Sequence, residues 1–231
     1  MLNGVLEYLQ SMDDIAVAIR LMLATLCGSL IGWERVVRRH SAGIRTFALV
    51  SLGSAVATVL NLYLTMLPGM DADVSRIPAG VVSGIGFLGA GTIILTGRNQ
   101  IKGLTTAASL WVASCMGMAF GAGYITVGLV CFAFVMIANV ILVHLSQLIE
   151  ENSRYVSIYI EVEESNGIKK LRKKIAELGY EINSMNKTKD KTLSGNDSAL
   201  MLELDFGSKH SHHDLMEELN NLDFVNYVEE V

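Results

Sequence analysis

The sequence predicts a membrane-embedded α-helical bundle followed by a soluble α+β domain. Of the 231 residues 51% are hydrophobic, and the mean hydropathy of +0.42 is too high for an ordinary soluble domain. The charges are distributed unevenly, because residues 1–149 contain eight Lys or Arg and six Asp or Glu, whereas residues 150–231 contain ten and seventeen. We therefore expect a transmembrane domain at 1–149 and an acidic soluble domain at 150–231.

Long apolar runs recur through the first domain, each close to the roughly 20 residues that a spanning helix needs. Met1 to Ile15 carries acids in place of a basic leader region, so a cleavable signal peptide is not expected. We predict five transmembrane helices, at about residues 15–33, 46–67, 77–97, 104–120 and 125–148.

The loops between these runs predict the orientation, because Lys and Arg accumulate on the cytoplasmic side of a membrane. Residues 34–45 contain four arginines and residues 97–103 contain Arg98 and Lys102, whereas residues 68–75 and 121–124 contain neither Lys nor Arg. The N-terminus is therefore expected outside the cell. With five spans, the C-terminal domain is expected in the cytoplasm.

The first span carries Gly28 and Gly32, a spacing that lets a neighbouring helix approach closely. It ends at Glu34 and Arg35. A carboxylate beside an otherwise cationic loop is not explained by the positive-inside rule, so Glu34 is a candidate for a specific ion pair or a cation contact.

Arg20 lies about two turns inside the outer end of this span. In one interpretation its side chain snorkels toward the membrane surface. In the other it is a functional intramembrane charge that pairs with Asp13, Asp14 or Asp73.

The outer loop at residues 68–75 contains two carboxylates, Asp71 and Asp73. Oxygen ligands suit a hard divalent cation such as Mg²⁺. Two acids at this spacing are a weak metal signal, and the alternative is a solvated loop in which Asp73 interacts with Arg76 at a helix start.

The next run is rich in glycine, with Gly84, Gly86, Gly89 and Gly91 inside nine residues. The spacing formally matches a dinucleotide fingerprint, but neither a preceding strand nor a following acid supports that interpretation, and we reject it. A continuous helix would place Gly80, Gly84 and Gly91 on one face for close packing. A broken helix would instead offer backbone carbonyls to a cation.

Several motifs of this domain occur together and resemble the MgtC/SapB family of bacterial inner-membrane proteins over about residues 15–130. The motifs are Gly28-x-x-x-Gly32-x-Glu34-Arg35, Gly43-Ile44-Arg45-Thr46, Asp73-x-Ser75-Arg76-Ile77, residues 83–91 and Lys102-Gly-Leu-Thr-Thr-Ala-Ala-Ser-Leu-Trp111. Val74 departs from the proline expected at this place in many relatives, so we expect the outer loop to turn differently here.

This resemblance implies a part in magnesium homeostasis and in growth when Mg²⁺ is scarce, with a role in intracellular survival in some pathogenic members. It implies a location in the bacterial plasma membrane. The residues that it marks are Arg35, Arg45, Thr46, Arg76, Gly84, Gly86, Gly89, Gly91, Lys102, Thr105 and Thr106.

Beyond Arg154 the periodicity changes. Strands are predicted at 156–162, 180–189, 199–206 and 224–231, with helices at 167–178 and 211–222. The order βαββαβ is ferredoxin-like, and it looks like the ACT-type sensor domain of some family members. The alternating last strand offers an edge for a second copy, so we predict a homodimer.

Neither a nucleophile and base pair nor a phosphate-binding loop is found, so an enzyme is not expected. One hypothesis is a membrane protein that binds or transports Mg²⁺, with Glu34 and Asp73 as groups on opposite sides and backbone groups near residues 84–91 between them. The other is a regulator that packs against another membrane protein while its C-terminal domain senses a signal. The small number of carboxylates within the predicted spans distinguishes the two hypotheses and favours the regulator, because a path that dehydrates Mg²⁺ normally needs such groups. The expected partners are the lipid bilayer, a second copy and a membrane protein, not nucleic acid.

Overall fold

The structure, a computed structural model, describes residues 2–38, 40–69, 72–95, 101–151, 155–163, 166–188, 197–205 and 212–230. Its internal contacts divide the chain into two compact units. The first comprises Met1–Leu95 and Ile101–His144, and the second contains Leu145–Val231. The two units are described separately.

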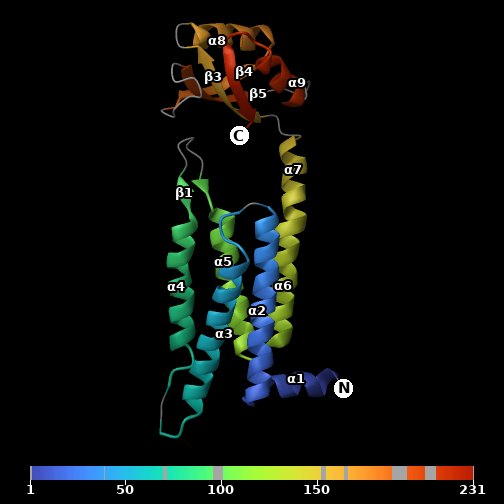
Figure 1. Cartoon of the computed structure of the whole chain (residues 1–231), viewed down its shortest axis with the longest axis vertical. Coiled ribbons are helices and arrows are strands. Elements are labelled where there is room, and N and C mark those ends of the chain that lie inside the picture. Colours follow the sequence, from blue (N-terminus) through green and yellow to red (C-terminus); the bar gives the residue numbers. More distant parts are fainter. Residues whose placement is uncertain are drawn as a thin grey trace. The chain divides into compact units, whose positions relative to one another are not determined.

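The first unit is a bundle of helices (Figure 1). Among the described residues, four helical segments are long and apolar enough to cross a membrane: α2, α3, α5 and Ile125–Ser146. Its elements are α1 (Leu2–Gln10), α2 (Asp14–Val37), α3 (Ile44–Met66), α4 (Arg76–Thr92), α5 (Leu104–Gly121), α6 (Ile125–Ile137) and the π-helical turn η1 (Ala138–Leu142), which continues into α7 (Val143–Glu151).

The predicted third span, residues 77–97, ends earlier than expected. α4 has 17 residues and stops at Thr92, where the Ile93 amide donates to the Ala90 carbonyl at 3.1 Å and tightens the last turn. Ile94–Leu95 (β1) then pairs with Ile101–Lys102 (β2) in antiparallel register. Isoleucine and leucine are apolar in a helix and in a strand alike, so hydropathy alone placed this boundary wrongly.

α1 was not predicted, because nine residues are too few for a clear helical pattern in an apolar chain. Leu9 of α1 is only 8% exposed and belongs to the hydrophobic core of the bundle, with Leu6 packed beside it. In Figure 1, α1 runs across the bundle axis near the end where α2 begins.

Helices α2 and α5 both approach α3 closely, at small residues. A Cβ atom at Gly28 would lie 2.7 Å from the carbonyl oxygen of Phe47, and one at Gly117 would lie 2.2 Å from that of Ser51. Gly32 meets Ile44 in the same way, at 2.6 Å. These backbone contacts are the close packing that small residues permit between membrane helices.

The second unit contains the predicted element order, βαββαβ. Its antiparallel sheet has the strand order β4-β5-β3-β6, so the first strand of the unit lies in the middle and β6 at an edge. Alternate residues of β3, from Val156 to Val162, are buried with Leu171 and Ile175 of α8. The elements are β3 (Tyr155–Glu163), α8 (Gly167–Glu177), β4 (Glu181–Lys187), β5 (Asp197–Asp205), α9 (His212–Asn220) and β6 (Val225–Glu230).

Candidate functional site

Most of the motif residues that are polar or charged lie at one end of the bundle. There α2 and α4 end, and α3 and α5 begin (Figure 1). We call the residues Glu34, Arg35, Arg38, His40 and Thr106 the junction cluster.

Arg35 is the buried centre of the junction cluster. Arg35 is only 1% exposed, and its Nη2 donates a hydrogen bond to Oγ1 of Thr106 on α5 at 3.3 Å. Its Nε has no hydrogen-bond partner within the described part of the chain. Thr106 is buried as well, whereas Thr105, the other threonine of the motif, is exposed. Both threonines belong to the motif of the resemblance, but only Thr106 points into the bundle.

Glu34 forms an ion pair within its own helix. Its Oε1 lies 2.6 Å from Nε of Arg38, one turn later. The second carboxylate oxygen, Oε2, is buried and accepts no hydrogen bond from the described residues. Of the two contacts expected for Glu34, the structure therefore contains the ion pair.

His40 follows the same turn, and its backbone amide donates to the Arg35 carbonyl at 3.0 Å. Partial burial is the main reason that the pKa of His40 lies below its usual value. The positive charges of Arg35 and Arg38 lower it further, and the negative charge of Glu34 opposes them. The neutral imidazole is therefore favoured at this place.

Three cations marked by the resemblance lie outside the junction cluster. Arg45 near the start of α3, Lys102 in β2 and Arg76 at the start of α4 all have exposed side chains, as has Thr46. Exposed groups of this kind are available to water or lipid headgroups, in contrast to Arg35.

Asp73 lies at the opposite end of the bundle from Glu34, in the loop between α3 and α4 (Figure 1). Its Oδ1 accepts hydrogen bonds from the backbone amide and the hydroxyl of Ser75, at 2.8 and 2.7 Å. These two bonds, and to a smaller extent the charge of Arg76, hold the pKa of Asp73 below its usual value. Asp73 is thus the solvated residue of a helix start that the alternative interpretation expects.

The predicted metal ligands do not meet. Glu34 and Asp73 belong to opposite ends of the helices, and Asp71 lies outside the described residues. Within the described ranges, no group of three or more His, Cys, Asp or Glu side chains is placed to hold a metal ion.

The glycine-rich run is continuous helix through residues 84–91, so the broken-helix alternative is wrong for this segment. Gly89 faces α5, where an added Cβ would lie 3.4 Å from that of Ala107. Gly80, Gly84, Gly86 and Gly91 have no atom within 4 Å of such a Cβ. Gly80 was predicted as a packing residue, but it packs against no other helix among the described residues, because α4 turns its Ile85 and Gly89 side inward.

Arg20 does not form the ion pair that one interpretation of the sequence expects. Its side chain is completely buried and donates to the Ser11 carbonyl at 3.1 Å, which ties the end of α1 to α2. It forms no ion pair with Asp13, Asp14 or Asp73 in the described part of the chain, where Asp13 instead accepts the hydroxyl of Tyr8.

A row of polar side chains inside the bundle was missed by sequence reasoning. Ser51, Ser54, Thr58 and Asn61 are all buried on α3, and Ser54 shares a 2.8 Å hydrogen bond with Ser114 of α5. Their spacing of three or four residues is the signal that could have identified one inward face.

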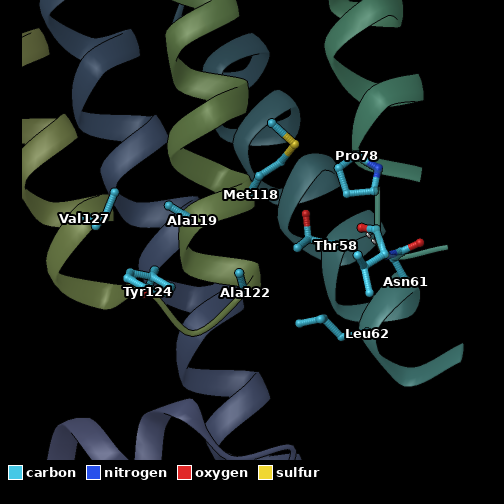
Figure 2. A pocket seen from close by; sticks show the side chains of 10 residues that line it. Thr58, Asn61, Leu62, Pro78, Met118, Ala119, Ala122, Tyr124 and Val127 are labelled. Atoms are coloured by element: carbon cyan, nitrogen blue, oxygen red, sulfur yellow. Dashed lines mark hydrogen bonds between the residues drawn. The ribbon is translucent and has the colours of Figure 1, made fainter. Parts of the chain in front are cut away.

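The last two members of this row line a pocket of about 410 Å³. Figure 2 shows Thr58 and Asn61 on one side of it and Ala119, Ala122 and Tyr124 on the other. The side-chain amide of Asn61 donates to the Val74 carbonyl at 2.8 Å, so Asn61 also fixes the loop that carries Asp73.

Comparison with known proteins gives a family for the membrane unit. The model of the MgtC family matches residues 21–148. Similar curated proteins include the "Putative magnesium transporter YhiD" of Escherichia coli K12, which is 43% identical over 115 residues, covering 48% of this chain and 53% of that protein. "Protein MgtC" of Brucella abortus is 42% identical over 127 residues, covering 55% and 51%.

An uncharacterized protein of Haemophilus influenzae is 32% identical over 143 residues, covering 60% of this chain and 58% of the relative. The chain thus spans about half the length of the curated relatives that it matches. No solved structure matches. The family match extends over more than half of the chain and includes the junction cluster, the glycine-rich helix and the long apolar helices, so the protein belongs to the MgtC family.

Proposed function

We propose that this protein is an inner-membrane component of bacterial magnesium homeostasis that supports growth when Mg²⁺ is scarce. The family match and the name of the E. coli relative support the link to magnesium. For the mechanism we propose regulation, in which the membrane unit packs against another membrane protein.

One observation carries the choice of mechanism. The membrane unit has no Asp or Glu between Glu34 and the loop before α4, and none between Asp73 and Glu150. Among the described residues, its most deeply buried charged side chains are Arg20 and Arg35, which repel a divalent cation. The buried carboxylate of Glu34 is paired with Arg38. A path that strips water from Mg²⁺ needs oxygen ligands of negative charge, so this interior suits helix packing better than Mg²⁺ conduction.

The outer surface of α4 supports the regulatory mechanism. Gly80, Gly86 and Gly91 leave open space beside the helix backbone, and Phe87 between them is 83% exposed. Gly84 instead lines a pocket between α4 and α3. Membrane helices associate through such small residues because their backbones can approach closely.

We propose that α4 crosses the membrane as a short fifth span, with the N-terminus outside and the second unit in the cytoplasm. The sheet order and the βαββαβ connectivity support a ferredoxin-like, ACT-like sensor. Edge strand β6 is the surface through which we propose that two copies pair.

Mg²⁺ flux into liposomes that contain only the purified protein tests the mechanism. A Mg²⁺-sensitive dye inside the vesicles should report no influx above that of empty vesicles, while an added ionophore confirms that the dye responds. Influx that is lost in Asp73→Ala but kept in Asp223→Ala would establish transport and overturn the regulatory proposal.

Growth at low Mg²⁺ tests the packing surface. In a strain that depends on this protein, Gly80→Leu and Gly91→Leu should abolish growth, because a large side chain fills the open face. Ala108→Leu, at an exposed position of α5, is the matched control and should support growth. Full growth of both glycine variants at normal protein levels would exclude this face.

A further inference from the structure

We infer that the pocket between α3, the start of α4 and the α5–α6 turn binds a membrane-soluble alcohol, a molecule with an apolar body and one hydroxyl group. We call it the Asn61 pocket. This inference rests on the pocket alone and is independent of the proposed part in magnesium homeostasis.

The walls of the Asn61 pocket require an apolar ligand. Eight of its ten lining residues are aliphatic, sulfur-containing or aromatic, among them Leu62, Pro78, Met118 and Val127. They offer no charge to a ligand, and an ionic group would lose its hydration on entry. An engineered apolar cavity of about 150 Å³ takes up benzene, so about 410 Å³ has room for a chain or ring system of roughly twice that size or more.

The two polar residues of the pocket specify the hydrogen bond. Asn61 is 3% exposed, and its Nδ2 is committed to the Val74 carbonyl, which can only accept. This bond fixes the orientation of the amide, so Oδ1 is the atom of Asn61 left for a ligand. No donor in the described part of the chain reaches that oxygen.

Thr58 also uses its donor within the protein and keeps an acceptor for a ligand. It is 6% exposed, and its hydroxyl donates to the Ser54 carbonyl at 2.9 Å, which leaves the oxygen lone pairs for a donor. Both buried groups therefore present acceptors, one turn apart on α3. A ligand that brings a hydroxyl donor is complementary to them, whereas a ketone or an ester is not.

The depth of the pocket fits a molecule that partitions into the membrane. Asn61 lies five residues before the end of α3, or about 7.5 Å at 1.5 Å per residue. At this depth a ligand can keep its apolar body in the hydrocarbon region and its hydroxyl near the interface. The bound molecule would contact three elements of the bundle at once.

Photolabelling tests the inference. The purified full-length protein in lipid nanodiscs is exposed to a diazirine-bearing octanol or to the matching octane, and labelled peptides are identified by mass spectrometry. We expect the alcohol to label peptides that contain Thr58 to Leu62 or Met118 to Val127 at least five times more strongly than the alkane does. Unlabelled octanol should compete. Equal labelling by both probes would show a plain apolar groove and overturn the inference.

Three variants separate recognition from folding. Thr58→Val and Asn61→Leu keep the side-chain size but remove an acceptor, and each should reduce labelling by the alcohol to the level of the alkane. Ala119→Leu should reduce labelling by both probes, because it fills the pocket, whereas Ala108→Leu outside the pocket should change neither. If Thr58→Val and Asn61→Leu label like the unmodified protein while its thermal stability is retained, the hydrogen bond does not determine binding.

Discussion

Arg35 on α2 reaches Thr106 on α5 across 71 positions of the sequence, and the bond between Nη2 and Oγ1 measures 3.3 Å. The guanidinium is buried where α2 meets α5. Because an unpaired charge inside a membrane protein is costly, this bond both stabilises the bundle and fixes α5 relative to α2.

Replacing Thr106 tests this bond. Thr106→Val keeps the shape of the side chain but removes the oxygen that accepts from Arg35, so the free energy of unfolding should fall by about 1.5–3 kcal/mol. Thermal unfolding in detergent measures the change. Thr105→Val, on the exposed side of the same turn, is the control and should unfold as the unmodified protein does. Equal effects at the two positions would contradict a specific role for Thr106.

Glycine positions should differ sharply in their tolerance of a methyl group. In Gly117→Ala the new Cβ would lie 2.2 Å from the Ser51 carbonyl oxygen, so α3 and α5 must separate, and we expect a loss of about 1–3 kcal/mol. Gly86→Ala meets open space and should be neutral or slightly stabilising. Unfolding in the same detergent compares them, and a stable Gly117→Ala protein would show that the helices pack less closely than described.

The hydroxyl pair of Ser54 and Ser114 allows a double-mutant cycle. Ser54 already donates to the Val50 carbonyl at 2.8 Å, so Ser114 is the donor of the interhelical bond. The coupling energy from Ser54→Ala, Ser114→Ala and the double variant should be about 0.6 kcal/mol, the average for polar pairs in membrane helices. A coupling near zero would mean that each hydroxyl bonds only within its own helix.

The acid behaviour of Asp73 should depend on Ser75 more than on Arg76. Ser75→Ala removes one of the two hydrogen bonds to the carboxylate, so the pKa of Asp73 should rise toward its usual value, and Arg76→Gln should raise it less. Carboxyl NMR titration measures both shifts.

The direction of the linked stability follows from the lowered pKa. Since the pKa of Asp73 is lower in the folded protein than in the unfolded chain, its contribution to stability is complete well above the unfolded pKa and is lost as the pH falls through the folded pKa. The Ser75→Ala protein should lose part of this acid-sensitive stability, because the backbone amide of residue 75 still donates to Asp73. A larger pKa change in Arg76→Gln would show that charge, not hydrogen bonding, controls Asp73.

The sequence predicted the approximate places of the long helices because hydropathy depends only on composition over about 20 residues. Among the described residues, four of the five predicted spans are long and apolar enough to cross a membrane. It predicted the βαββαβ order because hydrophobic residues in a soluble segment recur every 3.6 residues in a helix and every second residue in a strand, and the change between these periods is visible in the sequence. The MgtC/SapB resemblance was confirmed by the family match.

What the sequence could not give was which face of each helix turns inward. Thr105 and Thr106 are chemically the same, and only the rotation of α5 decides which one meets Arg35. The same limit applies to α4, where Gly89 packs against α5 and Gly80 does not. The sequence predicted that Glu34 could form an ion pair, but it did not identify the partner. Arg38 is the partner because α2 continues to Val37 and so brings Arg38 one turn after Glu34.

If α4 crosses the membrane as we propose, its 17-residue length has a consequence for the surrounding lipid. At 1.5 Å per residue the helix is about 26 Å long, which is shorter than a hydrocarbon core of about 30 Å. A helix that is too short is accommodated by local thinning of the bilayer, at a cost that grows with each ångström of mismatch. Lipids with shorter acyl chains should therefore gather beside α4. The protein should also prefer thinner regions of the membrane.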